Sequence, residues 1–123
     1  MSKRGGYKLE TLEIYRLAKE LAVNIYEITK DYPKEEMFGL ISQTRRCASS
    51  VGANISEGYG RYHYNDEVRF DYIARGSLFE LQFHIDLAKE FDYISKDNFN
   101  KIVKMITHLG IKLNNYITYL KNR

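Results

Sequence analysis

The segment FNKIVKMITHLGIKLNNYITYL, residues 99–120, carries the most regular apolar pattern in the chain. Its large apolar residues lie 3, 4, 3, 4, 3 and 4 positions apart, at Phe99, Ile102, Ile106, Leu109, Leu113, Tyr116 and Leu120. Positions with this spacing line one face of an α-helix. The segment therefore predicts a long amphipathic helix, beginning near Ser95 or Asp97, whose apolar face other helices must cover.

Three further segments have helical spacing, and no strand-like alternation competes with it. Residues 9–30 carry an apolar face formed by Ile14, Leu17, Leu21, Ile25 and Ile28. Residues 34–59, whose first turn is also a candidate for a separate piece, carry one formed by Ile41, Thr44, Ala48, Val51 and Ile55. A helix beginning near Asn65 is expected to turn inward Phe70, Ala74, Ser77, Leu81, Ile85 and Ala88.

Residues with particular backbone preferences separate these helices. Pro33 disfavours helix at the residue before it and suits the first turn of the next helix. Gly58 and Gly60 are expected to end the 34–59 helix, because glycine readily takes the left-handed conformation found after helices. Asn65 is a good N-cap for the third helix. Four helices of about 30–39 Å joined by short turns predict an all-α, antiparallel up-down four-helix bundle over residues 9–123.

Composition and charge limit the class of protein. The 123 residues suit one domain, and the single cysteine, Cys47, excludes a disulfide within the chain. No apolar run is long enough to span a membrane and no signal-peptide core is visible, so we expect a cytoplasmic protein. The formal net charge is +3. Both ends are basic, because residues 1–8, expected to form a flexible arm, and residues 98–123 contain no acidic residue.

The stretch VGANISEGYGR, residues 51–61, is rich in small and polar residues. It lacks the glycine and lysine spacing of a phosphate-binding P-loop and follows a helix rather than a strand, so we do not expect it to hold a phosphate. Gly52 flanks the apolar face, where a missing side chain lets another backbone approach. A polar line, expected to face away from the core, consists of Gln43, Arg46, Ser50, Asn54, Glu57 and Arg61. It is either a solvated face or a contact surface.

Two blocks, YPKEEMFGLISQTRRCASSVGANISEGYGR at residues 32–61 and FDYIARGSLFEL at residues 70–81, resemble a known family. That family comprises the small four-helix bundles encoded by intervening sequences in bacterial large-subunit ribosomal RNA genes, together with the accessory variability determinant of diversity-generating retroelements. The matching positions are Pro33, Glu35, Glu36, Leu40, Gln43, Arg45, Arg46, Ser50, Asn54, Ile55, Glu57, Gly58, Ala74, Gly76, Ser77, Glu80 and Leu81. The resemblance extends from about residue 9 to residue 120.

The resemblance implies a bundle that assembles into homopentamers and has no known catalytic chemistry. For the retroelement branch it implies binding to nucleic acid and to a reverse transcriptase. Together with the polar line, the resemblance indicates helix-packing or oligomer contacts at Gln43, Ser50, Gly52, Asn54, Glu57, Gly76, Ser77 and Glu80.

We expect no catalytic residue, metal site or cofactor. A carboxylate-bridged di-metal bundle needs Glu-x-x-His pairs, whereas Glu80 and His84 lie four residues apart. His84 is expected at the edge of the core, donating a hydrogen bond to a neighbour. Cys47 is expected to be a packed thiol, because no histidine or aspartate is placed to activate it. The four apolar faces are also expected to lack the inward polar groups that a ligand site needs.

The basic residues favour a nucleic-acid-associated adaptor, and the alternative is a protein–protein scaffold such as a reverse-transcriptase accessory subunit. Lysines on the outer side of the last helix suit phosphate neutralisation. The tyrosines around Arg61, at positions 59, 62 and 64, suit stacking on unpaired bases. The candidate residues for binding RNA or DNA are Arg45, Arg46, Arg61, Lys101, Lys104 and Lys112. The competing interpretation is that these side chains only keep a bundle in solution.

Overall fold

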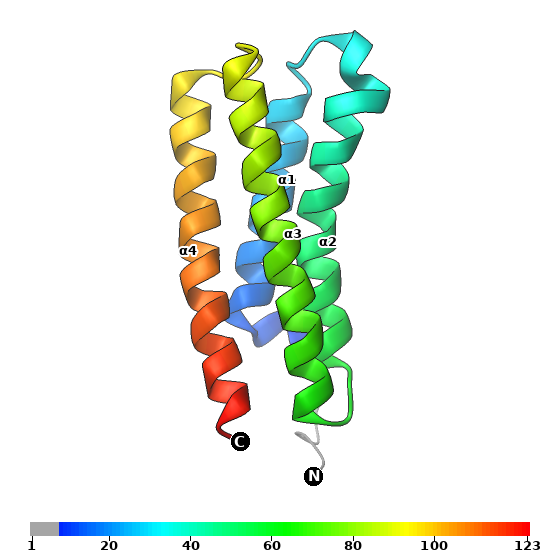
Figure 1. Ribbon diagram of the computed structural model, residues 1–123, viewed down its shortest axis with the longest axis vertical. Helices are drawn as coiled ribbons and strands as arrows, with labels where there is room; N and C mark the ends of the chain where they lie inside the picture. Colours follow the sequence, from blue (N-terminus) through cyan, green and yellow to red (C-terminus); the bar gives the residue numbers. More distant parts are fainter. Residues whose placement is uncertain (1–7) are drawn as a thin grey trace.

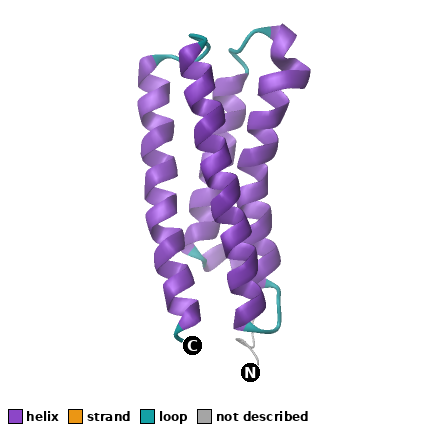
Figure 2. Cartoon of the chain, viewed as in Figure 1, coloured by secondary structure: helices purple, strands orange, loops and turns teal. Residues whose placement is uncertain are grey.

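The computed structural model describes residues 8–123 as four long helices with short connections (Figure 1). The helices are α1 (Glu13–Thr29), α2 (Ser42–Tyr59), α3 (Tyr64–Glu90) and α4 (Lys96–Lys121), and a 3-10 turn, η1 (Leu9–Thr11), precedes α1. Successive helices run in opposite directions along the long axis (Figure 1), and the described chain contains only helix and loop (Figure 2). The predicted all-α four-helix bundle is confirmed. The predicted basic arm lies outside the described residues, apart from Lys8.

Each helix packs on two neighbours around a shared core. α1 and α3 both contact α2 and α4, so α1 lies diagonally opposite α3. One fully buried leucine or isoleucine from each helix illustrates the core: Leu21, Ile55, Leu81 and Leu109. The apolar faces predicted for α1, α2 and α4 are confirmed, because their members are buried or packed partly against the core.

The chain reaches α2 through two short helical turns rather than one continuous helix. These are η2 (Lys34–Glu36) and η3 (Met37–Ile41), and the backbone of Gly39, inside η3, is non-helical. The Glu36 carboxylate accepts a hydrogen bond from the Leu40 N–H at 3.0 Å, which satisfies a backbone donor at the kink. The first turn predicted for this helix is therefore a separate piece.

The expected start and inner face of α3 need correction. The helix begins at Tyr64 with His63 at its N-cap, two residues before the expected cap at Asn65. Its buried face includes Glu67, Asp71 and Leu78, whereas the predicted inward residues Phe70 and Ser77 are only half-buried. The predicted start of α4 is confirmed, because the Ser95 hydroxyl caps it by accepting from the Asn98 N–H at 3.1 Å.

The end of α2 corrects the expected role of its two glycines. Gly58 lies inside the helix and is buried, and Gly60 caps it with right-handed φ of −78°. No described glycine has a positive φ. A Cβ at Gly58 would lie 2.9 Å from Phe70 Cβ and 3.0 Å from the Glu67 carbonyl oxygen. Gly58 is therefore required by the close approach of α2 to α3 rather than by a left-handed stop.

Candidate functional site

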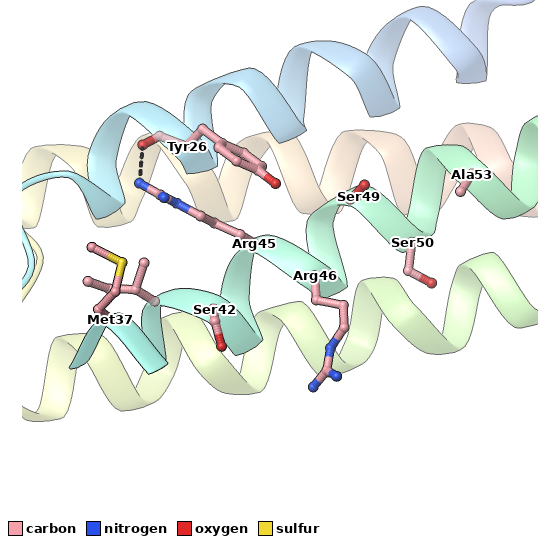
Figure 3. Close-up of a pocket in the computed structure, with 9 residues that line it drawn as sticks. Tyr26, Met37, Ser42, Arg45, Arg46, Ser49, Ser50 and Ala53 are labelled. Carbon is pink, nitrogen blue, oxygen red and sulfur yellow. Dashed lines mark hydrogen bonds between the residues drawn. The ribbon is translucent and has the colours of Figure 1, made fainter. Parts of the chain in front are cut away.

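Arg45 and Arg46 diverge from α2 beside a shallow cavity of about 530 Å³ (Figure 3). Arg45 reaches α1, where its Nε donates to Thr29 Oγ1 at 2.8 Å and its guanidinium lies 4.8 Å from the centre of the Tyr26 ring. Arg46 points to the other side of α2 and donates to Gln43 Oε1. The two neighbouring arginines therefore do not form one cationic patch, and Arg45 already serves as a cross-link between α1 and α2.

The remaining basic candidates are spread over the bundle. Lys101 and Lys104 are exposed on α4, and no carboxylate of residues 8–123 lies within 4 Å of either ammonium group. Lys112 lies further along α4 at the α1 side, 3.8 Å from Glu13. Arg61 follows α2 at the opposite end from Arg45 and pairs with Glu57 at 2.8 Å. The six candidates therefore do not converge on a single site, and only the α4 lysines share a surface.

The aromatic residues around Arg61 are only partly available for stacking on bases. Tyr59 is buried, contrary to the expectation, whereas Tyr62 is exposed and packs edge-on against His63. The Arg61 guanidinium lies 4.6 Å from the centre of the Phe70 ring. This arginine therefore packs over α3, and its cationic face is covered on one side.

The polar line of α2 follows the seam with α3 rather than the side away from the core. Ser50 Oγ lies 3.0 Å from Ser77 Oγ, so two predicted contact residues meet within one chain. Asn54 Nδ2 donates to Ser50 Oγ at 3.1 Å and extends this contact. Gly52 faces α1 instead, where a Cβ would lie an ordinary 3.5 Å from Ala18 Cβ. Gln43 and Glu57 remain exposed.

An exposed apolar stripe on α3 was not predicted as a feature, although it contains the predicted contact residue Gly76. Tyr72, Phe79 and Phe83 line it together with Gly76, at helical steps of 4, 3 and 4. Phe79 is 72% exposed and Phe83 is 59% exposed. The same spacing rule that identified the core faces would have identified this second face, which lies opposite the core-facing residues of α3.

A cluster of metal-ligating side chains lies between α2 and α3. Cys47, Glu80 and His84 place ligand atoms within 4.8 Å of one another. His84 Nε2 lies 3.4 Å from Glu80 Oε2 along α3, and Cys47 comes from the facing side of α2. A histidine therefore does lie within 4.8 Å of Cys47, whereas the expectation was that none is placed to activate the thiol. The sequence could not show it, because the contact depends on how two helices face each other.

Burial decides the state of the thiol in this cluster. Burial and the neighbouring Glu80 carboxylate raise the pKa of Cys47 to about 12. The hydrogen bond from this thiol lowers the pKa of Glu80. Because a thiolate is the nucleophilic form, Cys47 is a packed, protonated thiol at neutral pH, as the sequence predicted. His84 lies at the edge of the core, as expected, with Nε2 3.4 Å from Glu80 Oε2, although neither of its ring nitrogens makes a full hydrogen bond with residues 8–123.

Two buried carboxylates on α3 correct the expectation that no inward polar groups exist. Glu67 and Asp71 are fully buried, and Tyr116 of α4 donates to Glu67 Oε2 at 2.7 Å. Their spacing of four residues continues the buried face of Ala74, Leu78 and Leu81 toward the start of α3. The sequence could have shown these buried carboxylates, because Glu67 and Asp71 fall on the helical spacing of the core-facing residues of α3.

The fold and these surfaces define a small all-α bundle with polar and aromatic features on its seams and outer faces. None of the helices among residues 8–123 is long and apolar enough to cross a membrane. The model of the 23S rRNA-intervening sequence protein family matches residues 10–115. The chain belongs to this family, which confirms the resemblance to intervening-sequence proteins.

A solved structure supports the fold independently. The chain is similar to the crystal structure of a protein of unknown function from the S23 ribosomal protein family of Bacteroides thetaiotaomicron. The TM-score is 0.79 at 24% sequence identity, and the likeness covers 85% of this chain and 95% of that one. At this identity the likeness shows the fold. No curated protein matches the chain.

Proposed function

We propose that this chain is a non-enzymatic, self-assembling four-helix bundle that associates with nucleic acid, and that copies meet through the outer face of α3. The exposed stripe of Tyr72, Gly76, Phe79 and Phe83 carries this proposal. Large apolar side chains grouped on one face mark an interaction surface more often than scattered ones do. A second copy of the chain is the occupant that fits, because the family resemblance implies homopentamers.

Gly76 supports contact with a second chain. A Cβ at this position would have no neighbour within 4 Å, so packing within the chain does not require glycine there. Glycine inside a helix costs about 1 kcal/mol relative to alanine. Close approach of another backbone over the stripe explains why the helix carries this residue.

The lysines of α4 support the nucleic-acid part of the proposal. Lys101 and Lys104 are exposed one helical turn apart, where both can meet adjacent phosphates. A single pair gives weak binding, but an assembly repeats it on every copy. Repetition raises avidity by about 100-fold or more when several copies contact one nucleic acid.

Native mass tests assembly through the stripe. The wild-type chain should give a multiple of 14.5 kDa, and Phe79→Glu should give the monomer mass, because the charge would be buried between copies. Phe38→Glu is the matched control, since Phe38 is 95% exposed and lies before α2 rather than on the stripe. A wild-type monomer, or assembly unaffected by Phe79→Glu, would contradict this interface.

A salt series with a structured RNA and a DNA duplex tests the nucleic-acid part. Binding should weaken steeply with salt, and Lys101→Glu with Lys104→Glu should reduce the log–log slope by about 2. The control, Lys19→Glu with Lys34→Glu, changes the net charge equally on other elements. Absence of binding at low salt would instead favour the protein–protein scaffold, which uses the α3 stripe and does not need the lysines.

A further inference from the structure

We propose that Cys47, Glu80 and His84 form a binding site for a thiophilic divalent cation at the α2–α3 seam, and that Zn²⁺ is the ion that the donor set fits best. The three side chains present one sulfur, one oxygen and one nitrogen donor from two neighbouring helices. Zinc sites in proteins are built from these three ligand types.

The distances suit a tetrahedral ion after small side-chain movements. Bond lengths of about 2.0–2.3 Å in a tetrahedral zinc site place ligand atoms about 3.3–3.8 Å apart. His84 Nε2 and Glu80 Oε2 are already 3.4 Å apart, and the widest separation in the cluster is within 4.8 Å. Rotation of the exposed Glu80 side chain and a slight shift of the thiol therefore close the site without moving either helix.

The spacing on α3 is suited to chelation. Glu80 and His84 are four residues apart, so both side chains lie on the same helix face, one turn apart. Pairs of ligands at this spacing bind zinc in helical metal sites. The three-residue spacing that the sequence analysis required applies to carboxylate-bridged di-metal bundles, not to a single ion with a cysteine ligand.

His84 is poised as a ligand by its surroundings. Its side chain is 13% exposed, Nε2 lies 3.4 Å from Glu80 Oε2, and neither buried ring nitrogen makes a full hydrogen bond with residues 8–123. Coordination of an ion would satisfy one of these buried nitrogens. The centres of the Phe83 and His84 rings lie 6.0 Å apart.

Charge balance also favours a divalent ion. On binding, the Cys47 S–H bond breaks, the proton leaves to solvent, and a sulfur–zinc bond forms. The thiolate and the Glu80 carboxylate then carry two negative charges, which neutralise Zn²⁺ in a partly buried place. Three protein donors leave the fourth tetrahedral position to water.

Titration of tag-free, full-length protein with ZnCl₂ and CoCl₂ tests the proposal. We expect one ion per chain, a sulfur-to-cobalt charge-transfer band, and a rise in Tm with Zn²⁺ but not with Mg²⁺, because thiolate and imidazole suit the softer ion. Absence of Zn²⁺ binding, or an equal response to Mg²⁺, would overturn the site.

Variants assign the ligands. Cys47→Ser and His84→Gln should each weaken Zn²⁺ binding by about 100-fold or more, and Cys47→Ser should abolish the cobalt–sulfur band. Glu80→Gln changes an exposed side chain, so it should weaken Zn²⁺ binding without disturbing the core. This variant keeps the assignment testable if either substitution at a buried residue prevents folding. His108→Gln and Glu90→Gln are matched exposed controls and should bind like wild type. Equal affinity in the Cys47, Glu80 and His84 variants would overturn the assignment.

Discussion

Replacing Gly58 by alanine tests the closest contact between α2 and α3. The added Cβ would lie 2.9 Å from Phe70 Cβ and 3.0 Å from the Glu67 carbonyl oxygen, and neither atom belongs to the flexible end of a side chain. The helices themselves must move apart, so the cost lies in the upper part of the range for an overpacked core, at about 2–3 kcal/mol. Alanine recovers about 1 kcal/mol of helix propensity.

Because the clash involves backbone, we expect Gly58→Ala to lower the free energy of unfolding by about 1–2 kcal/mol after this gain. In a chain of this size the loss corresponds to a Tm about 3–8 °C lower. Urea unfolding followed by far-ultraviolet circular dichroism measures it. Several protein concentrations are needed, because assembly would make the apparent stability depend on concentration.

Gly52→Ala is the matched control, since its Cβ would lie an ordinary 3.5 Å from Ala18 Cβ. This variant should gain about 0.5–1 kcal/mol from the same change of residue type. The two alanine variants should therefore differ in sign. A Gly58→Ala protein as stable as wild type, with unchanged oligomeric state, would refute the argument that close helix approach requires this glycine.

Three further substitutions probe individual buried and cross-helix groups. Burial raises the pKa of Tyr32 to about 12, so the folded state favours the neutral phenol; this stabilisation is complete below pH 10 and is lost as pH rises toward 12. Tyr32→Phe should remove the tyrosine ionisation that occurs at the highest pH in an ultraviolet titration. It should leave the free energy of unfolding at pH 7 unchanged or up to ~1 kcal/mol higher, because the Tyr32 hydroxyl has no hydrogen-bond partner among residues 8–123. A clear loss of stability at pH 7 would argue against this. Arg45→Ala removes the hydrogen bond to Thr29 and the contact with the Tyr26 ring, so it should lower the free energy of unfolding by about 1–2 kcal/mol in a urea titration. An unchanged unfolding midpoint would show that this cross-link does not stabilise the fold. Tyr116→Phe should cost about 1.5–3 kcal/mol, because its hydroxyl donates to the buried Glu67 carboxylate, and a neutral effect would mean that other groups satisfy this carboxylate.

The sequence predicts the bundle well because its core faces follow one simple spacing. The α4 seam from Ile102 to Leu120 is buried as expected apart from the half-buried Tyr116, and so is the face that runs from Ile41 in η3 to Ile55 in α2. Period and length alone distinguish these helices from strands. The start of α4 was also predictable, since the Ser95 cap has a local cause.

The inner face of α3 was less predictable because acids occupy two of its core positions. Glu67 suits the positive end of the helix dipole in the first turn of α3, where an acid can face solvent, yet Glu67 and Asp71 are both fully buried. Phe70 and Ser77 offered a competing apolar and small-residue line one step away. Residue type therefore favoured Phe70 and Ser77 as inward residues instead of Glu67, Asp71 and Leu78, although the other predicted positions, from Ala74 to Ala88, are buried.

The metal-ligating cluster could not be predicted from the sequence, because it depends on how α2 and α3 are rotated relative to each other. Glu80 and His84 are visibly one turn apart, but nothing in the sequence shows that Cys47, on another helix, faces them. The same holds for the pair of Ser50 and Ser77. Spacing within a helix identifies a face, and only packing shows what that face meets.

These contacts keep α2 and α3 in one register along the seam. Gly58 meets Phe70 at one end, Ser50 meets Ser77 in the middle, and Cys47 meets Glu80 further along. Close-packed interiors transmit strain rather than absorb it, so a side chain that separates the helices at Gly58 should also loosen the cluster. Glycine at one end of the seam therefore supports the geometry at the other, and Gly58→Ala should bind Zn²⁺ more weakly than Gly52→Ala although neither residue belongs to the proposed site. Equal Zn²⁺ affinity in the two variants would show that the two ends of the seam adjust independently.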